Sequence, residues 1–80
     1  SATLNNIQEQ GIPAALTGPL VRGDAGTIHK HLVALADQPD VQAAYIALAR
    51  LTVPLLQARG VPEMFYNQLE DLLDNAINDT

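Results

Sequence analysis

The sequence predicts an all-α protein, a small bundle of four to five helices. Apolar residues recur at intervals of three and four along most of the chain, and no segment alternates apolar with polar residues over the length of a strand. Glycine and proline interrupt this pattern at positions where helices begin and end. With 48% hydrophobic residues against 16% charged ones, a chain of 80 residues is expected to leave an apolar face uncovered.

The first helix is predicted over Thr3–Gln10. It contains two apolar residues three apart and stops at Gly11, a residue type suited to the left-handed conformation that often follows a helix. The next segment, Ile12–Leu16, contains Pro13 and is predicted to be an extended connection.

Two helix starts follow in close succession. Thr17 or Gly18 is predicted to cap a short helix, Pro19–Arg22, because proline suits the first helical turn, where its missing N–H costs nothing. Asp24 is the clearest N-cap of the chain, since its carboxylate can accept from backbone N–H groups in the following turn. The helix that it starts is predicted to reach Ala36. Its buried stripe is predicted to consist of Ile28, Leu32 and Leu35.

A long central helix is predicted in the second half of the chain. It starts at Pro39 or Asp40, runs to Arg59 and is closed by Gly60. This helix is apolar on most of its circumference, so burial on more than one side is expected. Its broad apolar face consists of Val41, Ala44, Tyr45, Leu48, Leu51, Leu55 and Leu56.

The final helix is predicted from Val61 and Pro62 to about Ile77. Its inward-facing residues are predicted to be Phe65, Leu69, Leu72, Leu73, Ala76 and Ile77. The aromatic residues Tyr45, Phe65 and Tyr66 stand at helical positions typical of core or dimer contacts. The acidic residues of this last segment favour a solvated helix face.

Composition argues against several classes of function. The formal net charge is −5 and the cations are scattered, so we expect no nucleic-acid partner. The chain has no cysteine, which excludes disulfides, thiol catalysis and thiolate metal sites. Its longest apolar stretches are interrupted by Arg50, Thr52 and Pro54, so we expect neither a signal peptide nor a membrane span. A soluble, cytoplasmic protein is the resulting expectation.

The segment Thr17-Gly18-Pro19 is the first candidate for a binding site. If it begins a helix, its backbone N–H groups point outward, which suits a carboxylate or a phosphate. The alternative is a tight cap between two packed helices. Arg22 is either an anion contact or the ion-pair partner of Asp24, and the sequence does not decide between the two.

Two histidines are the second candidate. His29 and His31 are two residues apart, so on a helix they point in nearly opposite directions and do not share a metal ion. We therefore expect no metal site. His31 is instead expected to hydrogen-bond back to the segment 17–24, as a structural tie or as a proton donor.

The segment from Ala15 to Asp24 resembles a known family. Its Ala-Leu-Thr-Gly-Pro run, two apolar residues, Arg-Gly-Asp and the later Thr27, Ile28, His31 and Leu32 follow the pattern of a C-terminal domain long catalogued as a domain of unknown function. That domain occurs in Rossmann-like NAD(P)-binding oxidoreductases related to pyrroline-5-carboxylate reductase and ketopantoate reductase. The flanking runs Leu4–Ile7 and Tyr45–Ala49 are also similar, so the resemblance spans most of the chain.

The resemblance implies the role of a domain within a longer enzyme. Residues 1–80 would be the distal part of a helical dimerisation and substrate domain, similar to part of the 6-phosphogluconate dehydrogenase C-terminal-like domain. The parent would bind NAD or NADP on an N-terminal Rossmann domain, whose glycine-rich fingerprint this sequence lacks. Neither catalytic nor cofactor-binding residues are expected here, and a homodimer is expected. The substrate-binding residues implied for the parent are Thr17, Gly18, Pro19, Arg22 and His31.

A free-standing helical module for protein–protein interaction is the alternative function. Its sharpest version, an acyl-carrier protein, needs a serine at the start of a helix for the phosphopantetheine arm, and the only serine is Ser1. A hydrolase is disfavoured too, because no serine or cysteine nucleophile lies near a histidine in the sequence. A generic protein-binding bundle stays open.

Overall fold

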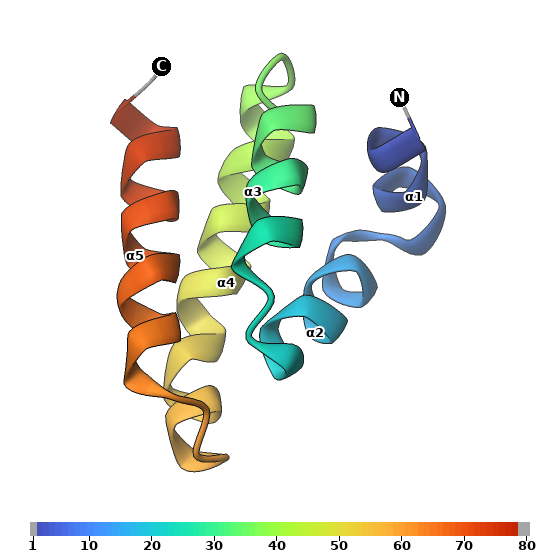
Figure 1. Cartoon of the computed structure of the whole chain (residues 1–80). Helices are drawn as coiled ribbons and strands as arrows, with labels where there is room; N and C mark the ends of the chain where they lie inside the picture. The colour runs from blue at the N-terminus through green and yellow to red at the C-terminus, as the bar shows by residue number, and fades with distance from the viewer. Residues whose placement is uncertain (1, 79–80) are drawn as a thin grey trace.

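The structure is a computed structural model that describes residues 2–78. It consists of five helices: α1 (Ala2–Gln10), α2 (Ile12–Arg22), α3 (Ala25–Ala34), α4 (Pro39–Ala58) and α5 (Glu63–Asn78). In Figure 1, α3, α4 and α5 stand together, and α1 and α2 lie to one side of them. No strand occurs between residues 2 and 78, which confirms the predicted all-α bundle of four to five helices.

The segment 12–22 differs most from its prediction. It forms one continuous helix, α2, so the expected extended connection over Ile12–Leu16 is wrong, and Thr17 and Gly18 do not begin a helix. Pro13 fits because it lies in the first turn, where no N–H is needed. Pro19 lies inside the helix. The helix accommodates Pro19 because the preceding residue, Gly18, has no Cβ to clash with the proline ring.

A tight corner joins α2 to α3 at Gly23 and Asp24. Gly23 has φ 66°, and the N–H groups of Gly23 and Asp24 donate to the carbonyls of Leu20 and Pro19, which ends α2 in a Schellman motif. Asp24 then caps α3 as predicted: its carboxylate accepts from the Thr27 N–H at 3.1 Å and from the Thr27 hydroxyl at 2.7 Å. One residue thus completes the end of one helix and the start of the next.

Two buried polar contacts join α3 to α4. The His31 ring and the Tyr45 hydroxyl share a hydrogen bond of 2.8 Å, and the Gln42 amide donates to the Leu32 carbonyl at 2.9 Å. The second contact satisfies a carbonyl near the C-terminus of α3, where helices leave such groups unpaired. Because both contacts are buried, they specify how the two helices lie against each other.

The core lies between all five helices. Ile28, Leu35 and Leu69 have no exposed surface, and the predicted inward stripe of α3 is buried in full. Phe65 and Tyr66 are core residues too, one of the two alternatives expected for the aromatic residues. The expected inward position of Ile77 concerns a side chain outside those that the structure describes. The buried apolar residues are Ile7, Ala15, Leu16, Leu20, Ile28, Leu32, Leu35, Tyr45, Ile46, Ala49, Leu56, Phe65, Tyr66, Leu69 and Leu73.

The central helix α4 is covered on one side only, contrary to the expectation of burial on several sides. α2 and α5 pack against it, and its buried residues are Gln42, Tyr45, Ile46, Ala49 and Leu56. From the predicted apolar face, Ala44, Leu51 and Leu55 are exposed instead. Since 80 residues supply only a thin layer of helices, the opposite side of α4 has nothing within residues 2–78 to cover it.

The burial of side chains on α5 predicts how a cavity there would change the stability of the fold. Leu69→Ala removes a fully buried side chain and is expected to lower the free energy of unfolding by about 2–5 kcal/mol. Met64→Ala, on the same helix and 72% exposed, is the matched control and should change it little. Urea unfolding followed by circular dichroism measures both. Equal effects of the two substitutions would contradict the packing of α5.

The corner predicts a pH effect on stability. Hydrogen bonds from Thr27 hold the pKa of Asp24 below its ordinary value of 3.8, with a smaller contribution from Arg22, and burial opposes them. A lowered pKa in the folded state means that the contribution of Asp24 to stability is complete above pH 3.8 and is lost as the pH falls through the lower, folded value. Asp24→Ala should therefore lower the melting temperature at pH 7 and flatten its decline in acid. An unchanged acid limb in thermal melts would refute this.

Candidate functional site

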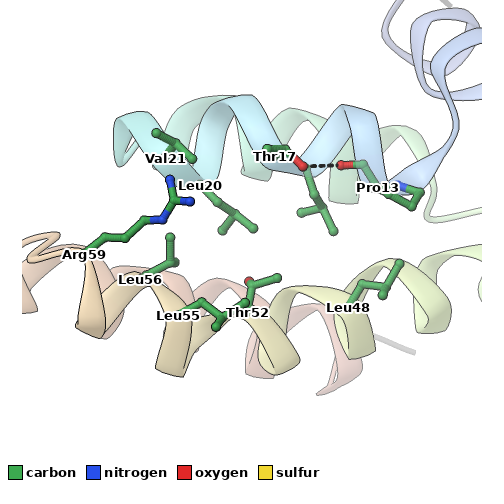
Figure 2. A pocket seen from close by; sticks show the side chains of 10 residues that line it. Pro13, Thr17, Leu20, Val21, Leu48, Thr52, Leu55, Leu56 and Arg59 are labelled. Atoms are coloured by element: carbon green, nitrogen blue, oxygen red, sulfur yellow. Dashed lines mark hydrogen bonds between the residues drawn. The ribbon is translucent and has the colours of Figure 1, made fainter.

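An open apolar groove runs between α2 and α4. Figure 2 shows its two walls facing each other, with Leu20 and Val21 on α2 and Leu48 and Leu55 on α4. Its volume is about 240 Å³, more than a cavity of about 150 Å³ that holds a benzene molecule. The residues that line it are Pro13, Leu16, Thr17, Leu20, Val21, Leu48, Thr52, Leu55, Leu56 and Arg59.

The polar groups of the groove are few. The hydroxyls of Thr17 and Thr52 donate to the carbonyls of Pro13 and Ala49, both at 2.7 Å, so each oxygen keeps only accepting capacity toward a ligand. Arg59 stands at the end of the groove and extends toward α2 in Figure 2. No carboxylate lines the groove within residues 2–78. The groove is therefore an apolar surface with one cation at its end.

The predicted substrate-binding residues do not gather in one place. Thr17 is exposed and lines the groove, whereas Gly18 and Arg22 lie on a different side of α2. Pro19 and His31 are buried in the bundle. The backbone N–H groups of the Thr17-Gly18-Pro19 segment lie inside a helix, so the outward-pointing set expected from a helix start is not formed.

Arg22 makes the ion pair that was one of its two expected roles. Its guanidinium lies 3.5 Å from the Asp24 carboxylate, and both side chains are partly exposed, at 61% and 38%. The same guanidinium lies across Gly18, where an added Cβ would come within 2.9 Å of it. An exposed pair of this kind contributes little to stability, so Arg22 remains accessible to an anion.

His31 bonds to a different partner from the one expected. Its ring contacts Tyr45 edge to face at 5.5 Å between centroids and hydrogen-bonds to the Tyr45 hydroxyl, not to the segment 17–24. The reason is the orientation of α3, which directs this position into the bundle toward α4. Burial lowers the pKa of His31, and the negative charge of Asp24 opposes that shift. Burial also raises the pKa of Tyr45. Both groups are therefore neutral at pH 7.

The side of α4 away from the core is an uncovered apolar face. Leu51 is 72% exposed and Leu55 is 64% exposed, although both lie within α4. By length and composition α4 is apolar enough to cross a membrane, and only 28% of its most apolar stretch is buried. The sequence contained the signal for this surface, since the helix is apolar around most of its circumference. The exposed apolar residues of α4 are Ala43, Ala44, Ala47, Leu51, Pro54, Leu55 and Ala58. Five of them, Ala44, Ala47, Leu51, Leu55 and Ala58, follow one line along the helix and are called the α4 stripe; Ala43 and Pro54 flank it.

The described residues fit neither a metal ion nor a dinucleotide. No group of three His, Asp or Glu side chains that could hold a metal occurs within the described part of the chain. A dinucleotide needs a glycine-rich turn between a strand and a helix, where N–H groups face the pyrophosphate. Gly18 lies inside α2 and Gly23 ends it, so neither glycine forms such a turn.

The fold and the groove define a small all-α bundle with an open apolar groove and an uncovered helix face. The chain belongs to the family described as Domain of unknown function (DUF2520), whose model matches residues 1–52. The match includes α1 to α3 and the first part of α4. It agrees with the resemblance to a domain of unknown function, whereas the reductase parent stays a prediction. Comparison with curated proteins and with solved structures finds no match.

The buried histidine predicts a measurable titration. Because the folded pKa of His31 is lowered below its ordinary value of 6.5, the unfolded chain binds more protons in that range. The contribution of His31 to stability is complete above pH 6.5 and is lost as the pH falls through the folded value. NMR titration should place the His31 midpoint below 6.5, with His29→Gln used to assign the signal. A midpoint above 6.5 would contradict its burial.

Proposed function

We propose that this chain is the helical dimerisation and substrate-cleft domain of an NAD(P)-dependent oxidoreductase, without catalytic activity of its own. The resemblance of the segment 15–32 to such enzymes supplies the enzyme class. Membership of the DUF2520 family is compatible with it but names no activity. In this proposal the dinucleotide binds elsewhere in a longer, cytoplasmic parent protein, and the described helices close the cleft.

The uncovered α4 stripe is the observation that supports the dimerisation role in this proposal. A soluble bundle rarely leaves side chains such as Leu51 and Leu55 largely exposed on one continuous face, because apolar surface is driven out of water. A second helical chain would cover that face. The groove between α2 and α4 adjoins the stripe through Leu55, which belongs to both. One partner surface can therefore cover the stripe and border the groove.

The substrate-facing surface is assigned to exposed residues on two different sides of α2, Thr17 beside the groove and Arg22 beside Asp24. Thr17 and Arg22 are exposed, and Arg22 carries the positive charge that a carboxylate or phosphate substrate would need. Gly18 lets that guanidinium lie close to the backbone. Pro19 and His31 would shape the cleft from beneath, since both are buried. Neither is proposed to touch the substrate in this conformation.

A bilayer and nucleic acid are not proposed as partners. The central helix is long and apolar enough to span a membrane, but Arg50 on that helix pairs with Asp74 on α5 at 2.6 Å. A charged residue near the middle of a spanning helix is costly. The free-standing interaction module stays the second candidate, because the same stripe would serve it equally well.

The proposal predicts a dimer that depends on the α4 stripe. Light scattering across a concentration series should give twice the mass of 8.5 kDa. Leu51→Lys should produce a folded monomer, because it places a charge at the centre of the stripe. Gln57→Lys, also exposed on α4 but outside the stripe, is the matched control and should leave the dimer intact. A wild-type monomer at all concentrations would refute the dimerisation role.

The enzyme class has its own test. NADPH fluorescence should show no binding to this chain and saturable binding to the longer parent polypeptide. In the parent, Arg22→Gln should weaken inhibition by small carboxylates while leaving NADPH affinity unchanged. A dimer whose parent binds neither NADH nor NADPH would favour the interaction module.

A further inference from the structure

We infer that two copies of this chain pack α4 against α4 in an antiparallel dimer whose twofold axis passes beside Leu51. The inference rests on the proposed dimerisation role and specifies its surface, orientation and register. Three observations carry it: the spacing of the α4 stripe, its symmetry about one residue, and the charges at its two ends.

The spacing places the stripe on one line along the helix. Positions 44, 47, 51, 55 and 58 are separated by three, four, four and three residues, so they share one face of a helix with 3.6 residues per turn. The buried residues Tyr45, Ala49 and Leu56 lie on the opposite face. The stripe is thus the side of α4 that the bundle leaves open along its length.

The stripe is symmetrical about Leu51. Ala44 and Ala58 lie seven residues on either side of it, and Ala47 and Leu55 lie four residues on either side. In an antiparallel pair centred on Leu51, Ala44 faces Ala58 of the partner subunit, and Ala47 faces Leu55 of the partner subunit. Each large side chain off the axis then meets a small one, an arrangement that packs well between helices.

A twofold axis requires a surface that is complementary to itself, and this stripe meets that condition. Three alanines allow the helix backbones to approach closely at both ends of the contact. The two copies of Leu51 meet at the axis. The antiparallel direction also sets the positive end of each helix dipole beside the negative end of the other.

The charges at the ends of α4 select the antiparallel direction. Asp40 lies in the first turn and Arg59 just beyond the last residue of the helix, and both are exposed. Neither forms an ion pair within residues 2–78. Antiparallel packing brings Asp40 of one protomer near Arg59 of the other at both ends. Parallel packing in the same register would set like charges together, so the charges disfavour it.

Cysteine cross-linking tests the register, and the absence of native cysteine keeps it simple. Oxidised Leu51→Cys should form a covalent dimer, because the axis brings the two sulfurs together. A mixture of Ala44→Cys and Ala58→Cys chains should form roughly tenfold more covalent dimer than either alone, since disulfides tolerate only short separations. Gln57→Cys, exposed on α4 but outside the stripe, is the matched control and should not cross-link.

A charge exchange gives a second measurement that does not depend on oxidation. Asp40→Lys and Arg59→Glu should each raise the dimer dissociation constant roughly fivefold at low salt, by placing like charges at both ends. The double variant Asp40→Lys with Arg59→Glu should return to the wild-type constant, because each end again joins opposite charges. In a parallel dimer the double variant would still place like charges together, so the dissociation constant would show no such recovery.

The outcomes separate this inference from the proposed function. A wild-type monomer overturns both, and a monomer that floats with phosphatidylcholine vesicles assigns the stripe to a bilayer instead. A stable dimer in which Leu51→Cys does not cross-link would overturn the inferred contact surface but not the proposed dimerisation role. Cross-linking of Ala44→Cys with itself overturns the antiparallel direction. Selective Ala44–Ala58 cross-linking together with recovery in the double charge variant supports the inference.

Discussion

The corner at Gly23 and Asp24 is the constraint on which the arrangement of the helices depends. Gly23 takes a left-handed conformation that other residues rarely adopt, and it packs in ordinary contact with the ring of Phe65. Asp24 completes the last turn of α2 and caps α3. Because two helices share this one turn, the direction of α2 is tied to that of α3. The groove along α4 is a consequence of that direction.

The polar contacts inside the bundle define which side of α4 is left open. His31 with Tyr45, and Gln42 with the Leu32 carbonyl, hold the buried side of α4 against α3. A rotation of α4 that covered Leu51 would break both contacts and leave buried polar groups unpaired, which is costly. The open stripe is therefore built into the same packing that specifies the core, and the proposed second subunit would cover it.

The helices of this fold follow from the local sequence more closely than the candidate site does. Periodicity and capping predicted α1, α3 and α4 to within two residues and placed the N-cap at Asp24. α2 is the exception: Pro13 and Gly18-Pro19 predict a break and a new helix start, but the segment is one continuous helix. Local rules treat each proline separately, whereas burial of Ala15, Leu16 and Leu20 on one face favours a continuous helix across them.

Local spacing and composition alone predict that the chain is helical, that helices end at Gly11 and Gly23, and that apolar surface exceeds what one small bundle can bury. Which apolar residues stay exposed depends on how the helices pack against one another. Leu48 and Leu51 have the same local pattern, yet one borders the groove and the other stands in the open stripe. The hydrogen-bond partner of His31 likewise depends on how α3 is oriented against α4 and not on neighbours in the chain.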